Sequence, residues 1–183
     1  MNAIIHPMDI TPAEYLYHQA MLSATFAQVE QASVWYFDAQ EVAEDVAEIL
    51  GTSLEVGASV VSAFSPRERW ANNVAKAYAF ANGKPVTGLT NNLNMAKAAL
   101  EHGFDALKGQ KTNAFARAIA GDTDAVVIDT WMLKAAGMDS SKGVNKGDYN
   151  MLADTVRKIA DEHGITPRTC QALIWIVKRG SAS

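Results

Sequence analysis

The sequence predicts an all-α protein. Its 183 residues are rich in alanine and include only 5 prolines and 12 glycines, a composition that favours helices. Three segments begin alike, with a hydroxyl residue followed by proline: TPAE at 11–14, SPRE at 65–68 and TPRT at 166–169. One segment is typical of a strand, AVVI at 125–128, but it has no partner strand. We therefore interpret it as a buried extended connector.

The first half of the chain is expected to form four helices, near residues 12–32, 36–50, 54–63 and 66–82. Thr11 and Ser65 begin the first and the fourth, because each hydroxyl can accept a backbone N–H of the first turn. The proline that follows fits the first helical position, and a glutamate three residues after the hydroxyl completes a capping box. Gly51 and Gly83 close two of these helices, where a left-handed cap is expected.

The second half of the chain is expected to form five helices, near residues 91–102, 111–120, 130–137, 149–163 and 167–178. Glycines follow four of them, at Gly103, Gly121, Gly137 and Gly164. Thr166 and Pro167 begin the last one. The segment 137–149 is rich in Gly, Ser and Lys and predicts a loop. The helix after it places one apolar stripe on its buried face, made of Met151, Leu152, Val156 and Ile159.

The composition excludes several classes of site. The chain length suits one domain or two small lobes. The single cysteine, Cys170, excludes an internal disulfide, a four-cysteine zinc site and a cysteine-ligated iron–sulfur cluster, and we expect it in the core. The four histidines show no metal-ligand spacing. There is neither a run of about 18 apolar residues nor a basic leader. We expect a cytoplasmic protein without a membrane span, metal or organic cofactor.

Charge is segregated along the chain. Residues 1–66 contain nine acidic residues and no Lys or Arg, whereas residues 67–183 contain all 16 basic residues and 11 acidic ones. Such segregation can leave a basic face for an anionic partner even though the net charge is −4. It is equally compatible with a solvated acidic face over residues 38–48 beside an ordinary surface.

The segment most indicative of chemistry is KGQKTNAFARAIAGDTDAVVIDTWMLKAAG at 108–137. Lys111 follows Gly109 and falls in the first turn of an expected helix, where backbone N–H groups can hold a phosphate. The positive end of that helix favours the neutral, nucleophilic form of a lysine. Asp129 occupies the N-cap position of the next expected helix, where a carboxylate accepts backbone hydrogen bonds and stays ionised. The pattern thus offers an attacking amine and a carboxylate that can stabilise positive charge.

GQKT and VIDTW, with eighteen residues from Lys111 to Asp129, resemble the signature of the helix–hairpin–helix DNA glycosylases, the superfamily of endonuclease III and the adenine glycosylases. ASVVSAFSPRERWANNVAKAYAF at 58–80 is similar to an upstream helix pair of that family that lies near the DNA. The resemblance implies a barrel-like lobe over 54–140 that contains the hairpin. It implies a second helical lobe formed by 1–53 and 141–183, and a cleft between the lobes that receives an extruded base.

The resemblance also implies roles for single residues, with DNA as the partner. Lys111 would attack C1′ of the extruded nucleotide and form a Schiff base. Asp129 would activate this nucleophile or stabilise an oxocarbenium-like sugar. Extrusion is required because the glycosidic bond cannot be reached inside a stacked duplex. Contacts with the DNA backbone are implied at Lys108, Gly109, Gln110 and Thr112.

The chain departs from the family pattern at several positions. Leu107 stands where the first hairpin glycine is expected, and Lys108 replaces an apolar residue. The hairpin is therefore either looser or held to the DNA backbone through Lys108. Trp131 stands where histidine is common, and an indole can donate a hydrogen bond but cannot take up a proton. The segment SAFSPRERW at 62–70 lacks the family's usual Gln after Ser, and the cluster cysteines are absent.

Two helical faces supply further candidates for a base pocket. Trp70 and Asn73 share a face at spacing i, i+3, next to two arginines, and Gln171 and Trp175 share one at i, i+4. The predicted pocket set is Ser65, Arg67, Arg69, Trp70, Asn73, Trp131, Gln171, Trp175 and Arg179. The alternative is that the tryptophans are core residues and the arginines are solvated. Three other aromatic residues are interpreted as packing, namely Trp35, Tyr36 and Tyr149.

The sequence therefore predicts a DNA base-excision or base-processing enzyme. Three alternatives remain open: a non-catalytic DNA-binding module of the same fold, an enzyme that alters an already modified base without excision, and a protein-interaction module built on the acidic residues 1–66. The oligomeric state also remains open, with a monomer among the possibilities.

Overall fold

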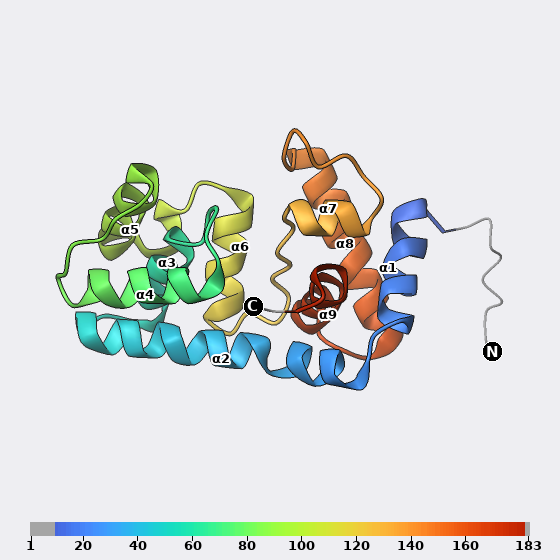
Figure 1. Cartoon of the computed structure of the whole chain (residues 1–183), viewed down its shortest axis with the longest axis horizontal. Coiled ribbons are helices and arrows are strands. Elements are labelled where there is room, and N and C mark those ends of the chain that lie inside the picture. The colour runs from blue at the N-terminus through green and yellow to red at the C-terminus, as the bar shows by residue number, and fades with distance from the viewer. Residues whose placement is uncertain (1–9, 182–183) are drawn as a thin grey trace.

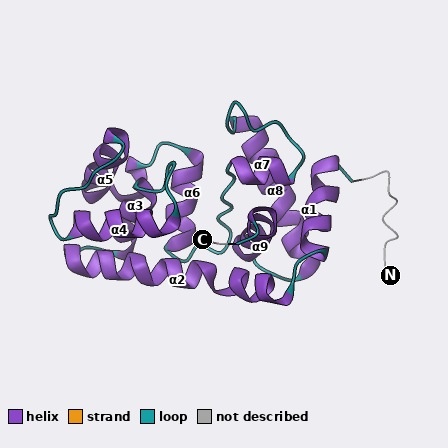
Figure 2. Ribbon diagram, in the orientation of Figure 1, coloured by secondary structure: helices purple, strands orange, loops and turns teal. Residues whose placement is uncertain are grey.

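The computed structural model describes residues 10–181, and within them every regular element is a helix (Figures 1 and 2). The prediction of an all-α protein is confirmed. The elements are α1 Pro12–Leu22, α2 Phe26–Leu50, α3 Leu54–Ala63, α4 Trp70–Ala81, α5 Thr90–His102, the 3₁₀ helix η1 Gly103–Ala106, α6 Gln110–Ile119, α7 Thr130–Ala135, α8 Lys146–His163 and α9 Pro167–Arg179. In the described part of the chain, no single helix is long and apolar enough to cross a membrane. By length and composition alone, the pair α2 and α3 passes that test together, with a bend of 109° between them.

The break between the first two helices lies at residues 23–25, so the predicted helix 12–32 was too long. Thr25 forms a capping box: its hydroxyl accepts the Gln28 N–H at 3.3 Å, and its own N–H donates to Gln28 Oε1 at 3.0 Å. These contacts satisfy backbone groups that a new helix start would leave without partners. The sequence TFAQ at 25–28 carried this signal and was overlooked.

The predicted helix start at Ser65 is wrong, whereas the caps at Thr11 and Thr166 are confirmed. Residues 65–68 form a turn in which the Glu68 N–H donates to the Ser65 carbonyl at 3.3 Å. Arg67 has a φ of +62°, as position i+2 of a type II turn requires, and Pro66 fits position i+1. A non-glycine residue in this left-handed region costs about 1 kcal/mol.

The structure also corrects the expectations for α8. The helix begins at Lys146, because the Asn145 side chain accepts the Asp148 N–H at 2.9 Å and caps it. The loop that was predicted over residues 137–149 therefore ends at residue 145, before α8. Met151 is 40% exposed and does not belong to the buried stripe. The buried face is made of Tyr149, Leu152, Ala153, Val156, Ile159 and Ala160.

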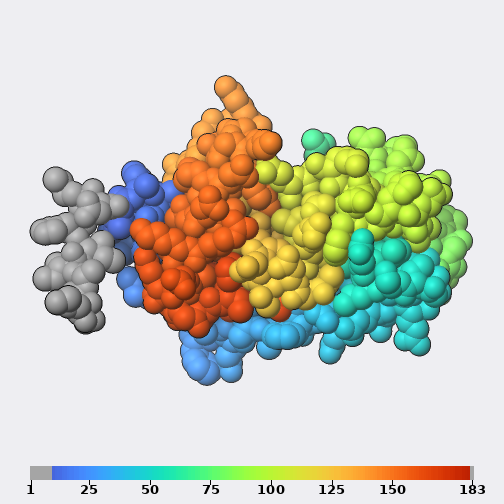
Figure 3. All heavy atoms as spheres, turned by 180° about the vertical axis from the view of Figure 1, so that it is seen from behind, coloured from blue at the N-terminus to red at the C-terminus, as the bar shows by residue number. Residues whose placement is uncertain are grey.

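Two hydrophobic cores organise the molecule. The first joins α2–α6 with part of α9, and the second joins α1, α7, α8 and the rest of α9. Residues 125–128 of the connector between α6 and α7 are buried, as predicted, and their side chains alternate between the two cores. Ala125 and Val127 belong to the first core, and Val126 and Ile128 to the second. Seen from behind, the chain around residue 120 lies at the surface between α8 and the helices α3 and α5 (Figure 3).

The division into two cores differs from the division expected from the sequence. Helix α2 belongs to the first core, although residues 1–53 were grouped with the C-terminal end of the chain. Helix α7 belongs to the second core, although it falls within the segment 54–140. Figure 1 shows the reason for the first difference, since α2 runs beneath α3, α4 and α6 and extends toward α9.

Helices α2 and α3 approach very closely at Gly57. A Cβ atom built there would lie 2.2 Å from the Ala43 carbonyl oxygen and 2.8 Å from the Ala47 Cβ. We expect Gly57→Ala to lower the free energy of unfolding by about 1–3 kcal/mol, because the helices would have to move apart. Urea unfolding measures this loss. The control is Gly147→Ala on α8, where the nearest atom is a side-chain oxygen at 3.3 Å. If both variants lose the same stability, close packing at Gly57 is not the cause.

Candidate functional site

A cavity of about 610 Å³ is lined by residues of both cores. Its walls come from α2, from the turn 65–68 with α4, from the start of α6, from the end of the connector with the start of α7, and from α8 and α9. Lys111 and Asp129 both line it. A cavity of this size is typical of small-molecule sites.

Lys111 is the second residue of α6 and is partly buried. Burial lowers the pKa of its ammonium group from the ordinary value, and the attraction of Asp129 opposes part of this shift. Within residues 10–181, its Nζ has no hydrogen bond or ion pair at contact distance. The neutral form of Lys111 is therefore more favoured than the neutral form of a solvated surface lysine.

Asp129 is the N-cap of α7, as predicted, and both of its carboxylate oxygens are occupied. Oδ1 accepts the backbone N–H groups of Trp131 at 2.8 Å and Met132 at 3.0 Å. Oδ2 accepts the indole N–H of Trp175, on α9, at 3.0 Å. Three donors from two elements thus fix the carboxylate at the edge of the cavity.

Aromatic rings form much of the cavity wall. Trp35, on α2, lies edge-on to Trp70, on α4, with ring centroids 5.0 Å apart. On its other side it stacks on Trp175, on α9, at 5.8 Å and an interplanar angle of 28°. Phe115, on α6, lies 6.3 Å from Trp70. Flat, electron-rich walls of this kind suit the face of a planar ring.

Cationic groups accompany the rings at α7 and α9. The Arg179 guanidinium lies 4.4 Å from the ring centroid of Trp175 and 5.8 Å from that of Trp131. The Lys134 ammonium lies 4.3 Å from the Trp131 centroid. Trp131 therefore carries cations on its ring, in the position where the resemblance expects a histidine. Arg67 adds an exposed guanidinium from the turn that also lines the cavity.

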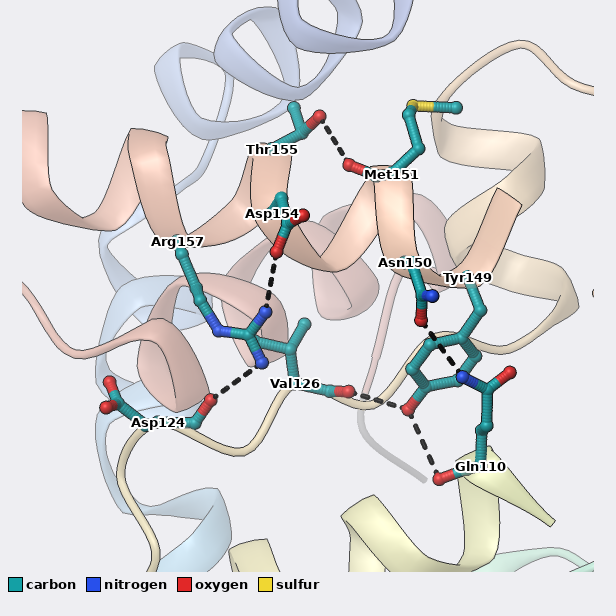
Figure 4. A network of polar contacts seen from close by, with 9 residues as sticks. All are labelled: Gln110, Asp124, Val126, Tyr149, Asn150, Met151, Asp154, Thr155 and Arg157. Carbon is teal, nitrogen blue, oxygen red and sulfur yellow. Dashed lines mark hydrogen bonds and ion pairs between the residues drawn. The ribbon is translucent and has the colours of Figure 1, made fainter. Parts of the chain in front are cut away.

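The start of α6 is fixed to α8 and to the connector, as Figure 4 shows. Gln110 Nε2 donates to Asn150 Oδ1 at 3.0 Å. The Tyr149 hydroxyl donates to the Val126 carbonyl at 2.7 Å, with the Gln110 carbonyl a second acceptor at 3.4 Å. These contacts hold the first turn of α6, which carries Lys111, against the second core.

The residues before α6 do not require a glycine at position 107. Leu107 has a φ of −91°, which any residue adopts, and its side chain is buried in the first core. A leucine in place of the expected hairpin glycine is thus explained by packing. Lys108, Gly109 and Gln110 are exposed, but the Thr112 side chain is buried and donates to the Gly109 carbonyl at 3.0 Å.

The structure brings most of the predicted pocket residues together. Those that line the cavity are Ser65, Arg67, Trp70, Asn73, Trp131, Gln171, Trp175 and Arg179. Arg69 is exposed at the N-cap position of α4 and is not among the lining residues. Lys108 lies instead on a neighbouring groove that also contains Arg117 and Arg157.

Some lining residues escaped the sequence analysis. Trp35, Tyr36 and Tyr149 were interpreted as packing, and all three also line the cavity, as does Phe115. The Tyr36 hydroxyl donates to Gln171 Oε1 at 2.7 Å across 135 residues of sequence. No local pattern reports such a distant contact. In residues 10–181, no group of three or more His, Cys, Asp and Glu side chains is placed to hold a metal ion.

The chain matches the family described as "Family of unknown function (DUF7178)" over residues 16–182. No curated protein and no solved structure matches it. The chemistry of the site therefore has to be argued from its own residues.

Two substitutions of Asp129 separate its two structural contacts. Asp129→Ala removes the cap and leaves the Trp175 indole without its acceptor, so we expect a loss of about 1–2 kcal/mol in the free energy of unfolding. Asp129→Asn keeps an acceptor for the cap but turns its NH2 group toward the Trp175 indole N–H, so we expect a smaller loss, of about 0.5–1 kcal/mol. Chemical denaturation measures both. Equal losses would mean that the indole contact, rather than the cap, holds this end of α7.

The burial of Lys111 predicts a stability that depends on pH. Its pKa is lower in the folded than in the unfolded chain, so the cost of burying the ammonium is complete below the folded pKa and disappears as pH rises toward 10.5. We expect Lys111→Met to raise the free energy of unfolding by about 0.5–2 kcal/mol at pH 7 and by less at pH 10. Lys108→Met, at an exposed position, is the control. A gain that is independent of pH would contradict this explanation.

Proposed function

The chain belongs to the DUF7178 family, described as of unknown function, and we propose that it processes an extruded nucleotide of DNA. In this proposal Lys111 is the nucleophile and Asp129 the carboxylate that serves it. The observation that carries the proposal is that these two side chains, from the starts of α6 and α7, line one cavity whose other walls are aromatic. The two-core architecture is compatible with the two-lobed helix–hairpin–helix fold that the resemblance implies, in which such a cavity receives the base.

The reaction begins with the neutral amine of Lys111. Its Nζ forms a bond to C1′ of the deoxyribose while the bond from C1′ to the base nitrogen breaks. The base leaves with the bonding electron pair and takes up a proton, and the amine nitrogen loses one. The nitrogen lone pair then forms a C=N bond as the C1′–O4′ bond breaks, and O4′ takes up a proton. The product is a Schiff base between Lys111 and the opened sugar.

Asp129 is suited to the charge that develops in this reaction. As the glycosidic bond breaks, positive charge grows on C1′ and O4′, and a fixed carboxylate nearby stabilises it. The three donors on Asp129 hold the carboxylate in place, so it does not have to reorganise during the reaction. The lowered pKa of Lys111 supports the same assignment, because the nucleophile must be neutral to attack.

DNA binding is supported by the surroundings of the cavity. The exposed Lys108 and Gly109 precede the N-terminus of α6, whose N–H groups can donate hydrogen bonds to a phosphate. Arg67 and Arg179 add positive charge at the cavity. The tryptophans offer stacking surfaces to a base that has left the duplex.

Reductive trapping tests the proposed chemistry. On DNA with an abasic site, the free aldehyde condenses with Lys111 and loses water, and borohydride reduces the C=N bond to a stable amine. We expect a covalent adduct with the natural chain, at least a hundredfold less with Lys111→Met, and an undiminished amount with Lys97→Met, which changes an exposed lysine of α5 outside the cavity. Asp129→Asn should lower the rate of trapping by about 10²–10⁴.

The other outcomes of trapping separate the alternatives. DNA binding without an adduct would favour a non-catalytic module and contradict the nucleophile. An adduct that persists in Lys111→Met would assign the chemistry to another amine. Release of free base from DNA, measured by chromatography, separates excision from an alteration of the base that leaves it attached.

A further inference from the structure

Two residues that line the cavity each bury a side-chain oxygen that has no partner among the described residues. Asn73 is only 2% exposed, yet its Oδ1 is buried without a hydrogen-bond partner among the described residues. The Ser65 hydroxyl, on a residue that is 8% exposed, is in the same state. Both residues line the cavity. Buried polar groups in proteins nearly always have partners, so this pair requires an explanation.

Other buried amides of the chain are satisfied. Asn92 is 5% exposed, and its Nδ2 donates to the Pro66 carbonyl at 3.1 Å. Gln171 is 4% exposed, and its Oε1 accepts the Tyr36 hydroxyl at 2.7 Å. The orphaned oxygen of Asn73 is therefore not a general property of this core.

Ligand binding would relieve the unsatisfied groups. A buried amide oxygen accepts hydrogen bonds and does not donate them, so Asn73 requires a ligand with an N–H or O–H group. Asn73 lies one helical turn after Trp70, whose ring stands in the aromatic wall. A ligand that contacts both residues is flat and carries a hydrogen-bond donor on its edge.

Gln171 defines the complementary group on the ligand. Because its Oε1 is occupied by Tyr36, only its amide N–H groups are left to face the cavity. These groups donate, so they suit a carbonyl oxygen or ring nitrogen of the ligand. The guanidinium groups of Arg67 and Arg179 and the carboxylates of Glu68 and Asp129 line the same cavity, so its charges nearly balance and a neutral ring suits it.

From these contacts we propose that the cavity selects a neutral nucleobase whose N–H group is accepted by Asn73, with the Ser65 hydroxyl beside it and Gln171 donating to an acceptor of the same base. This inference rests on the proposed function, since it takes the ligand to be the extruded base. Asn73 is then a specificity-determining residue: a base without that N–H leaves the oxygen unsatisfied and binds weakly.

Binding of bulged bases tests the assignment. The probes are DNA duplexes with one unpaired nucleotide that carries adenine, guanine, cytosine or thymine. Each has a partner probe in which one N–H donor of the pairing edge is removed or blocked by a methyl group: purine, 1-methylguanine, 2-pyrimidinone or 3-methylthymine. Quenching of tryptophan fluorescence gives Kd. We expect at least one natural base to bind about tenfold more tightly than its partner probe, and Asn73→Leu to bring this ratio close to one.

A matched variant controls for the loss of a buried polar group. Ser59, on α3, also has a buried hydroxyl without a partner among the described residues, but it does not line the cavity. Ser59→Ala should leave the ratio unchanged. Neither variant should lower the urea midpoint, because each removes a buried group that has no partner to lose. A marked loss of stability in Asn73→Leu would indicate a structural role and overturn the assignment.

Two measurements on the natural chain separate this inference from the proposed function. Abasic-site DNA carries no base, so trapping on it reports Lys111 and not base selection. If trapping fails while a base is still selected through Asn73, the nucleophile is wrong and the specificity assignment stands. If trapping succeeds but no natural base is preferred over its partner probe, or if Asn73→Leu keeps the preference, the specificity assignment is overturned.

Discussion

The site depends on one carboxylate and the three hydrogen bonds that it accepts. Asp129 ends the buried connector and begins α7, while its second oxygen binds the indole of Trp175 on α9. The connector alternates its side chains between the two cores, so its path is fixed by burial on both sides. Together these contacts determine where α7 begins relative to α6. They bring two residues eighteen positions apart, Lys111 and Asp129, onto one cavity.

Several energetically unfavourable features lie around that cavity, and core packing does not explain them. Lys111 is buried at a cost to its charged form, Arg67 adopts a left-handed backbone conformation, and Asn73 buries an amide oxygen without a partner. Each of these costs stability by itself. The close-packed helices elsewhere, such as α2 against α3, offset them. Local costs of this kind are expected where a protein prepares polar groups for a ligand rather than for its own stability.

The sequence predicted what local chemistry determines. The caps at Thr11, Asp129 and Thr166 depend only on neighbouring backbone N–H groups, and all three are found. The start expected at Ser65 failed because the same four letters also suit a turn with proline at its second position, and tertiary contacts decided between the two. Trp35 packs as predicted, but that it also lines the cavity escaped notice for a related reason, since its neighbours Trp70 and Trp175 are distant in sequence. Hydrogen bonds across more than a hundred residues leave no local pattern.

Helix α2 shows where part of the acidic charge of the first third of the chain lies in the fold. One face of this helix is buried, and near its middle Trp35 and Tyr36 line the cavity. The other face exposes a row of acidic residues, Asp38, Glu41, Glu44, Asp45 and Glu48. The cavity mixes Lys111, Arg67 and Arg179 with the carboxylates Glu68 and Asp129, so it lacks such a one-sided negative charge. For the DNA partner proposed above, the outer face of α2 would be repulsive, and the acidic residues would favour an approach from the side of the cavity.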